Sequence, residues 1–128
     1  MSGDKAPIRS YRDLVVWQEA MSLAEAAYRL SRQLPKEEMY ALAQQVRRSC
    51  SSVPANIAEG YGRDSTGAYV QHLRVAQGSL KELETHLLLA ERVELVDTIA
   101  IAPLLAKSEQ IGKMLGSLIR SVEQSQQR

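Results

Sequence analysis

The chain has 128 residues, of which 45% are hydrophobic and 24% are charged, and its net charge is +1. This length predicts a single domain with a buried core, and the near-neutral charge excludes nucleic-acid binding through a global basic field. Because Phe is absent and only one Trp is present, we expect an aliphatic core, which suits a helix bundle better than a β-sandwich.

The ends of the chain predict location and order. The first residues, MSGDKAPIRS, are polar and lack the apolar core of a signal peptide, and the apolar run 99–106 is too short to span a bilayer. We therefore expect a cytoplasmic protein that does not enter a membrane. Residues 1–9 are expected to form a disordered arm, residues 10–123 a helix bundle and residues 124–128 a frayed tail.

The first predicted helix begins after Ser10, which can cap it, and ends near Leu34 and Pro35. Two apolar stripes run along it: Leu14, Trp17, Met21, Ala24 and Tyr28, and beside them Val16, Ala20, Leu23, Ala27 and Leu30. Two stripes predict a wide buried face, which suits either two neighbours in the bundle or one neighbour and another subunit. Trp17 and Tyr28 are therefore candidate contacts between subunits.

The second predicted helix starts near Pro35, ends at Gly60–Gly62 and contains a proline. Its apolar positions are Met39, Leu42, Val46, Cys50, Val53 and Ile57. Because Pro54 cannot donate a hydrogen bond to the carbonyl of Cys50, we expect a kink at Pro54, with a helix break as the alternative.

The exit of this helix carries Asn56, Glu59 and Gly60. Asn56 and Glu59 are three residues apart, so both can face one neighbouring helix, and we expect a structural role for them. Gly60, Tyr61 and Gly62 form the stretch in which the helix C-cap is expected.

The third and fourth helices complete the pattern. Ser65 or Thr66 can cap the third, which carries an unbroken seven-residue repeat: Tyr69, Leu73, Ala76, Leu80, Leu83, Leu87 and Ala90. Gly78 beside this seam predicts a close backbone approach. The fourth helix is expected to open at Asp97 or Thr98. With short connections and no β pattern, the chain is predicted to be all-α, an antiparallel up-down-up-down four-helix bundle.

Motifs for catalysis or metal binding are not found in the sequence. Neither His72 nor His86 follows a Glu at the Glu-x-x-His spacing of di-iron bundles, and Cys50 occupies a seam position typical of a buried small hydrophobe. No Gly-rich phosphate loop follows a predicted strand. We therefore predict no catalytic residue, no metal and no cofactor, and a protein that is not an enzyme.

Charge is distributed unevenly along the chain. Residues 44–81 are mainly basic and residues 82–97 mainly acidic. With the second and third helices antiparallel, the basic side chains are predicted to form a modest patch: Arg47, Arg48, Arg63, Arg74 and Lys81. This patch can contact phosphate, or it can meet the acidic end of an identical neighbour, a head-to-tail contact that closes into a ring.

Four stretches carry a resemblance to a known family: residues 11–18 (YRDLVVWQ), 47–60 (RRSCSSVPANIAEG), 76–84 (AQGSLKELE) and 111–115 (IGKML). On these residues the chain resembles the four-helix-bundle family of 23S rRNA intervening-sequence proteins. A related group resembles the accessory subunit of diversity-generating retroelements. The resemblance implies a homo-oligomeric ring, a pentamer, and brings no catalytic residues with it.

Three hypotheses about function follow. The first is a ring-forming module that contacts RNA, or a reverse transcriptase together with nucleic acid, through the basic patch. The second is a purely protein-binding scaffold, in which the same basic residues hold subunits together. The third is an enzyme with a site between subunits. The near-neutral charge favours the second hypothesis over a strong RNA binder.

Overall fold

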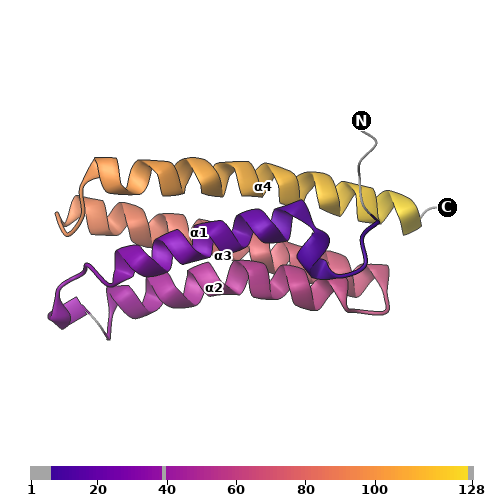
Figure 1. Ribbon diagram of the computed structural model, residues 1–128, viewed down its shortest axis with the longest axis horizontal. Coiled ribbons are helices and arrows are strands. Elements are labelled where there is room, and N and C mark those ends of the chain that lie inside the picture. The colour runs from indigo at the N-terminus through magenta and orange to yellow at the C-terminus, as the bar shows by residue number, and fades with distance from the viewer. Residues whose placement is uncertain (1–6, 39, 127–128) are drawn as a thin grey trace.

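The computed structural model describes residues 7–38 and 40–126, and within them it contains helices and no β-strand. The helices are α1 (Val15–Ser31), α2 (Leu42–Tyr61), α3 (Thr66–Arg92) and α4 (Thr98–Gln126), with two short 3-10 helices, η1 (Tyr11–Asp13) and η2 (Lys36–Glu38). The long helices lie side by side along one axis (Figure 1). The predicted all-α four-helix bundle is confirmed.

Hydrogen bonds between helices fix their relative direction. Late residues of α1 meet early residues of α2, as Ser31 does with Arg47. Asn56 near the end of α2 meets His72 near the start of α3, and Glu84 of α3 meets Ser108 of α4. Successive helices therefore run in opposite directions. Two ends of the bundle result: the loop end, where the α1–α2 and α3–α4 connections meet, and the opposite end (Figure 1).

The core is aliphatic, as the composition predicts. From Leu73 to Ala90 the seven-residue repeat of α3 is buried, and Tyr69 at its start packs against the core. The predicted apolar positions of α2 are buried as well, from Leu42 to Ile57, whereas Met39 lies outside the described residues. On α1 the stripe from Val16 to Leu30 is buried.

The start of the first helix differs from the prediction. Ser10 does act as a cap, but of η1: its Oγ accepts from the Arg12 N–H at 3.1 Å, and Asp13 Oδ2 accepts from the Ser10 N–H at 3.1 Å. Leu14 then adopts an extended conformation, with φ −73° and ψ 124°, so α1 begins at Val15. The Ser10 cap satisfies backbone N–H groups of the single turn η1, and the chain then bends before α1 starts.

The connection between α1 and α2 is longer than predicted. Helix α1 ends at Ser31 rather than Leu34, and the residues after Pro35 form only the 3-10 turn η2 before α2 begins at Leu42. A residue that precedes proline is disfavoured in the α conformation, which accounts for the early end. Leu34 is nevertheless buried in a small cluster with Leu42, Ala43 and Ala90, which ties the two connections together at the loop end.

Helix α2 continues through Pro54 without a break, from Leu42 to Tyr61. The alternative of a broken helix is therefore wrong, and the kink stays a prediction. Helix α4 begins at Thr98, one of the two predicted positions, and runs to Gln126 rather than ending at 123. Of the expected arm and tail, residues 1–6 and 127–128 lie outside the described residues. Within the described part of the chain, no helix has the length and apolarity that crossing a membrane requires.

The turn after α3 closes that helix with two backbone hydrogen bonds. The Leu95 N–H donates to the carbonyl of Ala90 at 2.9 Å, and the Glu94 N–H donates to the carbonyl of Glu91 at 3.0 Å. This is the Schellman arrangement, which places one residue in the left-handed region and favours glycine there. Here that residue is Glu94, with φ 65°, so the turn carries strain that glycine would relieve.

We predict that Glu94→Gly stabilises the protein. Relief of the left-handed strain exceeds the entropy that glycine adds to the unfolded chain, for a net gain of about 0.5–1 kcal/mol. Thermal unfolding should show a melting temperature raised by about 2–3 °C. Glu94→Ala, which removes the same charge and keeps a Cβ, should show no gain. An equal rise for both variants would mean that charge, and not backbone strain, limits stability here.

Candidate functional site

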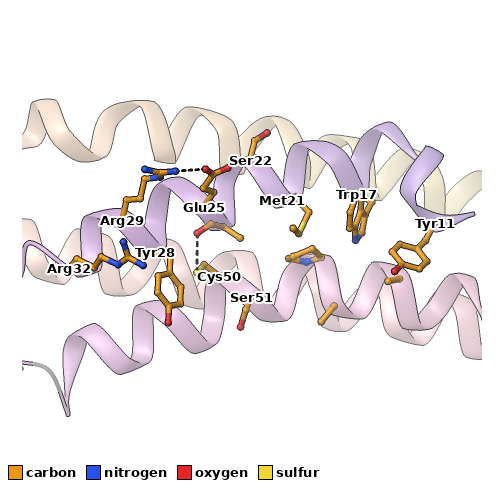
Figure 2. Close-up of a pocket in the computed structure, with 14 residues that line it drawn as sticks. Tyr11, Trp17, Met21, Ser22, Glu25, Tyr28, Arg29, Arg32, Cys50 and Ser51 are labelled. Carbon is orange, nitrogen blue, oxygen red and sulfur yellow. Dashed lines mark hydrogen bonds and ion pairs between the residues drawn. The ribbon is translucent and has the colours of Figure 1, made fainter.

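A groove with mainly apolar walls lies between α1 and α2 and is called here the α1–α2 groove; Figure 2 shows the residues that line it. Its volume is about 710 Å³. It runs from Tyr11 at the opposite end to Arg32 at the loop end. Its walls and floor are mainly apolar or small: Tyr11, Trp17, Met21, Ala24, Tyr28, Cys50, Pro54, Ala55 and Ala58.

The two stripes of α1 explain why this groove exists. The stripe that contains Ala20 and Leu23 points into the bundle and is buried. The other stripe, with Met21 and Tyr28, is directed over α2 and is 44% and 42% exposed at those residues. On α2 the facing positions are small, so nothing fills the space between the helices. Trp17 and Tyr28 both line this groove; their contact with another subunit stays a prediction.

Aromatic and basic side chains shape the two halves of the groove. At the opposite end Tyr11 packs edge-on against Trp17, with ring centroids 5.2 Å apart. Toward the loop end the Tyr28 ring lies near two guanidinium groups, that of Arg47 at 5.1 Å and that of Arg32 at 5.7 Å from its centroid. The groove therefore has an aromatic end and a basic end, and stacked guanidinium groups of this kind hold the Tyr28 ring in place.

Cys50 lies in the floor of the groove and is not a nucleophile. It is 1% exposed, and its Sγ lies 3.5 Å from the carbonyl oxygen of Ala24 and 3.4 Å from that of Arg47. Burial raises the pKa of this thiol to about 11, so it stays protonated at neutral pH. Since thiolates are the reactive form, Cys50 packs as a small hydrophobe.

On α2, the predicted basic residues turn to different faces of the bundle. Arg47 reaches α1, where its Nε donates to Ser31 Oγ at 2.8 Å. Arg48 is exposed and donates to Gln45 Oε1 at 2.9 Å on its own helix.

The other predicted basic residues pair with acids. Arg63 pairs with Glu59 at 2.6 Å, Arg74 with Glu123 of α4 at 3.2 Å, and Lys81 with Glu84 at 3.4 Å. Arg47 thus lies on the α1–α2 side of the bundle, whereas Arg74 and Lys81 line a second groove between α3 and α4. The predicted basic residues are not gathered on one surface.

This second groove, called here the α3–α4 groove, has a volume of about 860 Å³. Besides Arg74 and Lys81 it is lined by Lys113 and Arg120, which the sequence analysis did not single out. Its floor includes Gly78, Gly112 and Gly116. A Cβ placed on Gly78 would meet no atom within 4 Å, so the close backbone approach predicted there is absent within the described chain.

Asn56 stands at the centre of a polar network between α2 and α3. Its Nδ2 donates to the carbonyl of Ser52 at 2.9 Å, and its Oδ1 lies 3.2 Å from His72 Nδ1. Since that oxygen accepts, His72 Nδ1 carries the proton, and its Nε2 accepts from Arg63 Nε at 3.3 Å. Glu59 enters through its ion pair with Arg63. The hydroxyls of Ser52 and Ser79, 2.7 Å apart, extend the network toward the middle of α3.

Gly60 takes part in the contact between α2 and α3. Helix α2 ends at Tyr61 with Gly62 as its C-cap, so it ends within the predicted exit at Gly60–Gly62. A Cβ on Gly60 would lie 2.8 Å from His72 Cβ and 3.2 Å from the Tyr69 carbonyl oxygen. The absence of a side chain therefore lets α3 approach α2 directly beside the Asn56 network.

The titratable side chains were compared with the requirements of a metal site. Across residues 7–38 and 40–126, His, Cys, Asp and Glu side chains do not gather in any group that could hold a metal ion. His86 Nε2 is buried without a hydrogen-bond partner and lies 3.5 Å from Glu82 Oε2. In the α3–α4 groove the buried Ser108 hydroxyl donates to Glu84 Oε2 at 2.5 Å, and both residues line the groove.

Comparison with known proteins places these features in a wider set. The family model of the 23S rRNA-intervening sequence proteins matches residues 12–117. A crystal structure of a protein with unknown function, from the S23 ribosomal protein family of Bacteroides thetaiotaomicron, is similar at 26% sequence identity and a TM-score of 0.77. The similarity covers 82% of this chain and 98% of that one. Among curated proteins, none matches.

We predict that Asn56→Ala destabilises the protein by about 1–3 kcal/mol, because it leaves His72 and the Ser52 carbonyl without their partner in a half-buried site. Urea unfolding followed by circular dichroism measures this. Ser51→Ala is the matched control, since Ser51 is exposed on the same helix and bonds only locally to the Arg48 carbonyl. An unchanged unfolding free energy together with loss of a binding partner would instead make Asn56 a binding residue.

Proposed function

The chain belongs to the family of 23S rRNA-intervening sequence proteins, and on this premise we propose that it is a non-enzymatic protein that assembles with itself into a ring. The observation that carries the proposal is the α1–α2 groove. The apolar side chains of this groove, including the exposed Met21 and Tyr28, extend along the face of the bundle that α1 and α2 form. Contiguous apolar surface of this kind on a stable bundle is typical of a protein–protein interface.

The arrangement of charge supports a scaffold over a strong nucleic-acid binder. Arg63, Arg74 and Lys81 each lie beside a carboxylate, which offsets their charge toward phosphate. Arg47 is held against α1 by Ser31 and Tyr28 at the rim of the groove. This favours the hypothesis in which arginines hold protein surfaces together. The family resemblance supports five copies in the ring.

We predict that the protein is oligomeric in solution. Light scattering coupled to size-exclusion chromatography at micromolar concentration should report several times the chain mass of 14.2 kDa, and five times that mass for a pentamer. Apolar surface drives the association, so the oligomer should persist in high salt. A monodisperse species of one chain mass would contradict the proposal.

A second candidate function rests on the α3–α4 groove. Four basic residues line it, Arg74, Lys81, Lys113 and Arg120, against the acids Glu84 and Glu109. Because a Cβ on Gly78 would meet no atom within 4 Å, the floor is open at that position and an extended phosphodiester backbone has room to lie close to α3. A single α3–α4 groove is only weakly basic. A ring carries one such groove on each copy, and several weak contacts made together raise the apparent affinity for RNA. RNA is the ligand this groove would contact.

We predict for this candidate that Lys113→Gln combined with Arg120→Gln weakens binding of structured RNA at low salt. The double change removes up to two phosphate contacts, so the slope of log K against log salt should flatten by about 1–2. Arg9→Gln with Lys36→Gln, which removes two exposed charges outside the groove, is the matched control. Equal effects of both pairs, or no binding by the unaltered protein, would contradict a role for the groove.

A further inference from the structure

The last two turns of α3 carry apolar side chains that the bundle does not bury. Leu88, Leu89 and Val93 are 43%, 48% and 54% exposed, and together they are called here the α3 ridge. They lie off the buried seven-residue repeat, on the side of the helix away from the core. Leu89 and Val93 also border a hollow of about 560 Å³ beside the start of α2. The ridge is therefore an apolar surface separate from the α1–α2 groove.

The two surfaces are opposite in charge. The ridge lies in the acidic part of the chain, with Glu82 before it and Glu91, Glu94 and Asp97 around its end, against Arg92 alone. The loop end of the groove is basic, because Arg32 and Arg47 lie over the Tyr28 ring, while Arg29 in the lining pairs with Glu25. A groove placed on a second groove would bring basic ends together, whereas a ridge placed in a groove brings acid to base.

Their position along the bundle also matches. Helices α1 and α3 run in the same direction, since both are antiparallel to α2 (Figure 1). The basic end of the groove is formed by the last turns of α1, and the ridge by the last turns of α3. Both lie at the loop end, where Leu34, Leu42 and Ala90 join the two connections in one cluster. Copies joined through these surfaces are related by a rotation with little shift along the axis, the condition for a closed ring.

We propose that the α3 ridge of one copy packs into the α1–α2 groove of the next, a head-to-tail contact repeated around the assembly. This inference rests on the proposed function, self-assembly, and names the surfaces that perform it. Leu89 and its neighbours cover the face of Tyr28 at the loop end of the groove. At the loop end Arg32 and Arg47 meet the acidic residues that follow the ridge. Tyr28, an aromatic side chain flanked by arginines, has the composition of an energetic centre of such an interface.

The experiment uses two variants that each block one surface of the full chain. Tyr28→Glu replaces the half-exposed ring at the loop end of the groove with a negative group, and Leu89→Glu places one on the ridge. Each variant alone should be a monomer of 14.2 kDa by light scattering. Mixed in equal amounts they should form a dimer of twice that mass, because the first keeps its ridge and the second keeps its groove. Ala106→Glu, which introduces a glutamate at an exposed position of α4, should leave the assembly intact.

The outcomes separate this inference from the proposed function. A monomeric unaltered protein overturns self-assembly and the inference with it. An oligomeric unaltered protein whose Tyr28→Glu and Leu89→Glu forms stay oligomeric overturns only the inference, as do two monomeric variants that fail to pair when mixed. Circular dichroism checks that each variant is folded. Should Tyr28→Glu unfold, Arg32→Glu at the exposed basic end takes its place, with the same expected pairing.

Discussion

A four-helix bundle buries only the side chains that point at its own axis, and this chain carries apolar residues beyond that limit. On α1 the inner stripe with Ala20 and Leu23 is fully used by the core, whereas Met21 and Tyr28 of the outer stripe stay 44% and 42% exposed. On α3 the buried repeat is complete without Leu89, which is 48% exposed. Each 100 Å² of such surface that a partner covers is worth about 2.5 kcal/mol before the costs of association. The excess is concentrated on two surfaces, and this distribution gives the fold its capacity to assemble.

The α1–α2 groove and the α3 ridge differ in the charge of the residues around them. Between α2 and α3 the polar side chains of Asn56, His72 and Arg63 satisfy one another in a hydrogen-bonded network. At the surface, opposite charges are not fully paired. The basic end of the groove and the acidic residues around the ridge lie on one molecule, both at the loop end of the bundle. A bundle with a net charge of only +1 can therefore present strong local fields of both signs. Fields of this kind set orientation and partner choice more than total affinity.

The sequence predicts the parts of this structure that depend on local pattern. The repeat from Tyr69 to Ala90 specified α3 and its buried face, since a seven-residue period has one structural meaning over this length. The cap at Ser65 followed from its side-chain chemistry. The length of the α1–α2 connection does not follow from the sequence, because Leu34 is held by tertiary contacts that leave no local pattern. The basic residues do not form one patch for a similar reason, since contacts between helices set their surroundings: Arg74, for example, pairs with Glu123, forty-nine positions away on α4.

Tyr28 lies at the loop end of the α1–α2 groove, and Trp17, the only tryptophan of the chain, lines the other half of that groove beside Tyr11. A protein that combines Tyr28→Trp with Trp17→Phe therefore carries its single tryptophan at the proposed contact. The decisive measurement follows the emission of that tryptophan and its quenching by acrylamide while the protein is diluted through the range in which light scattering shows dissociation. If a second copy covers the loop end of the groove, emission should shift to the red and quenching should rise with the same midpoint as the loss of mass. A fluorescence signal that stays constant while the mass falls would contradict the account, because the copies would then be joined elsewhere.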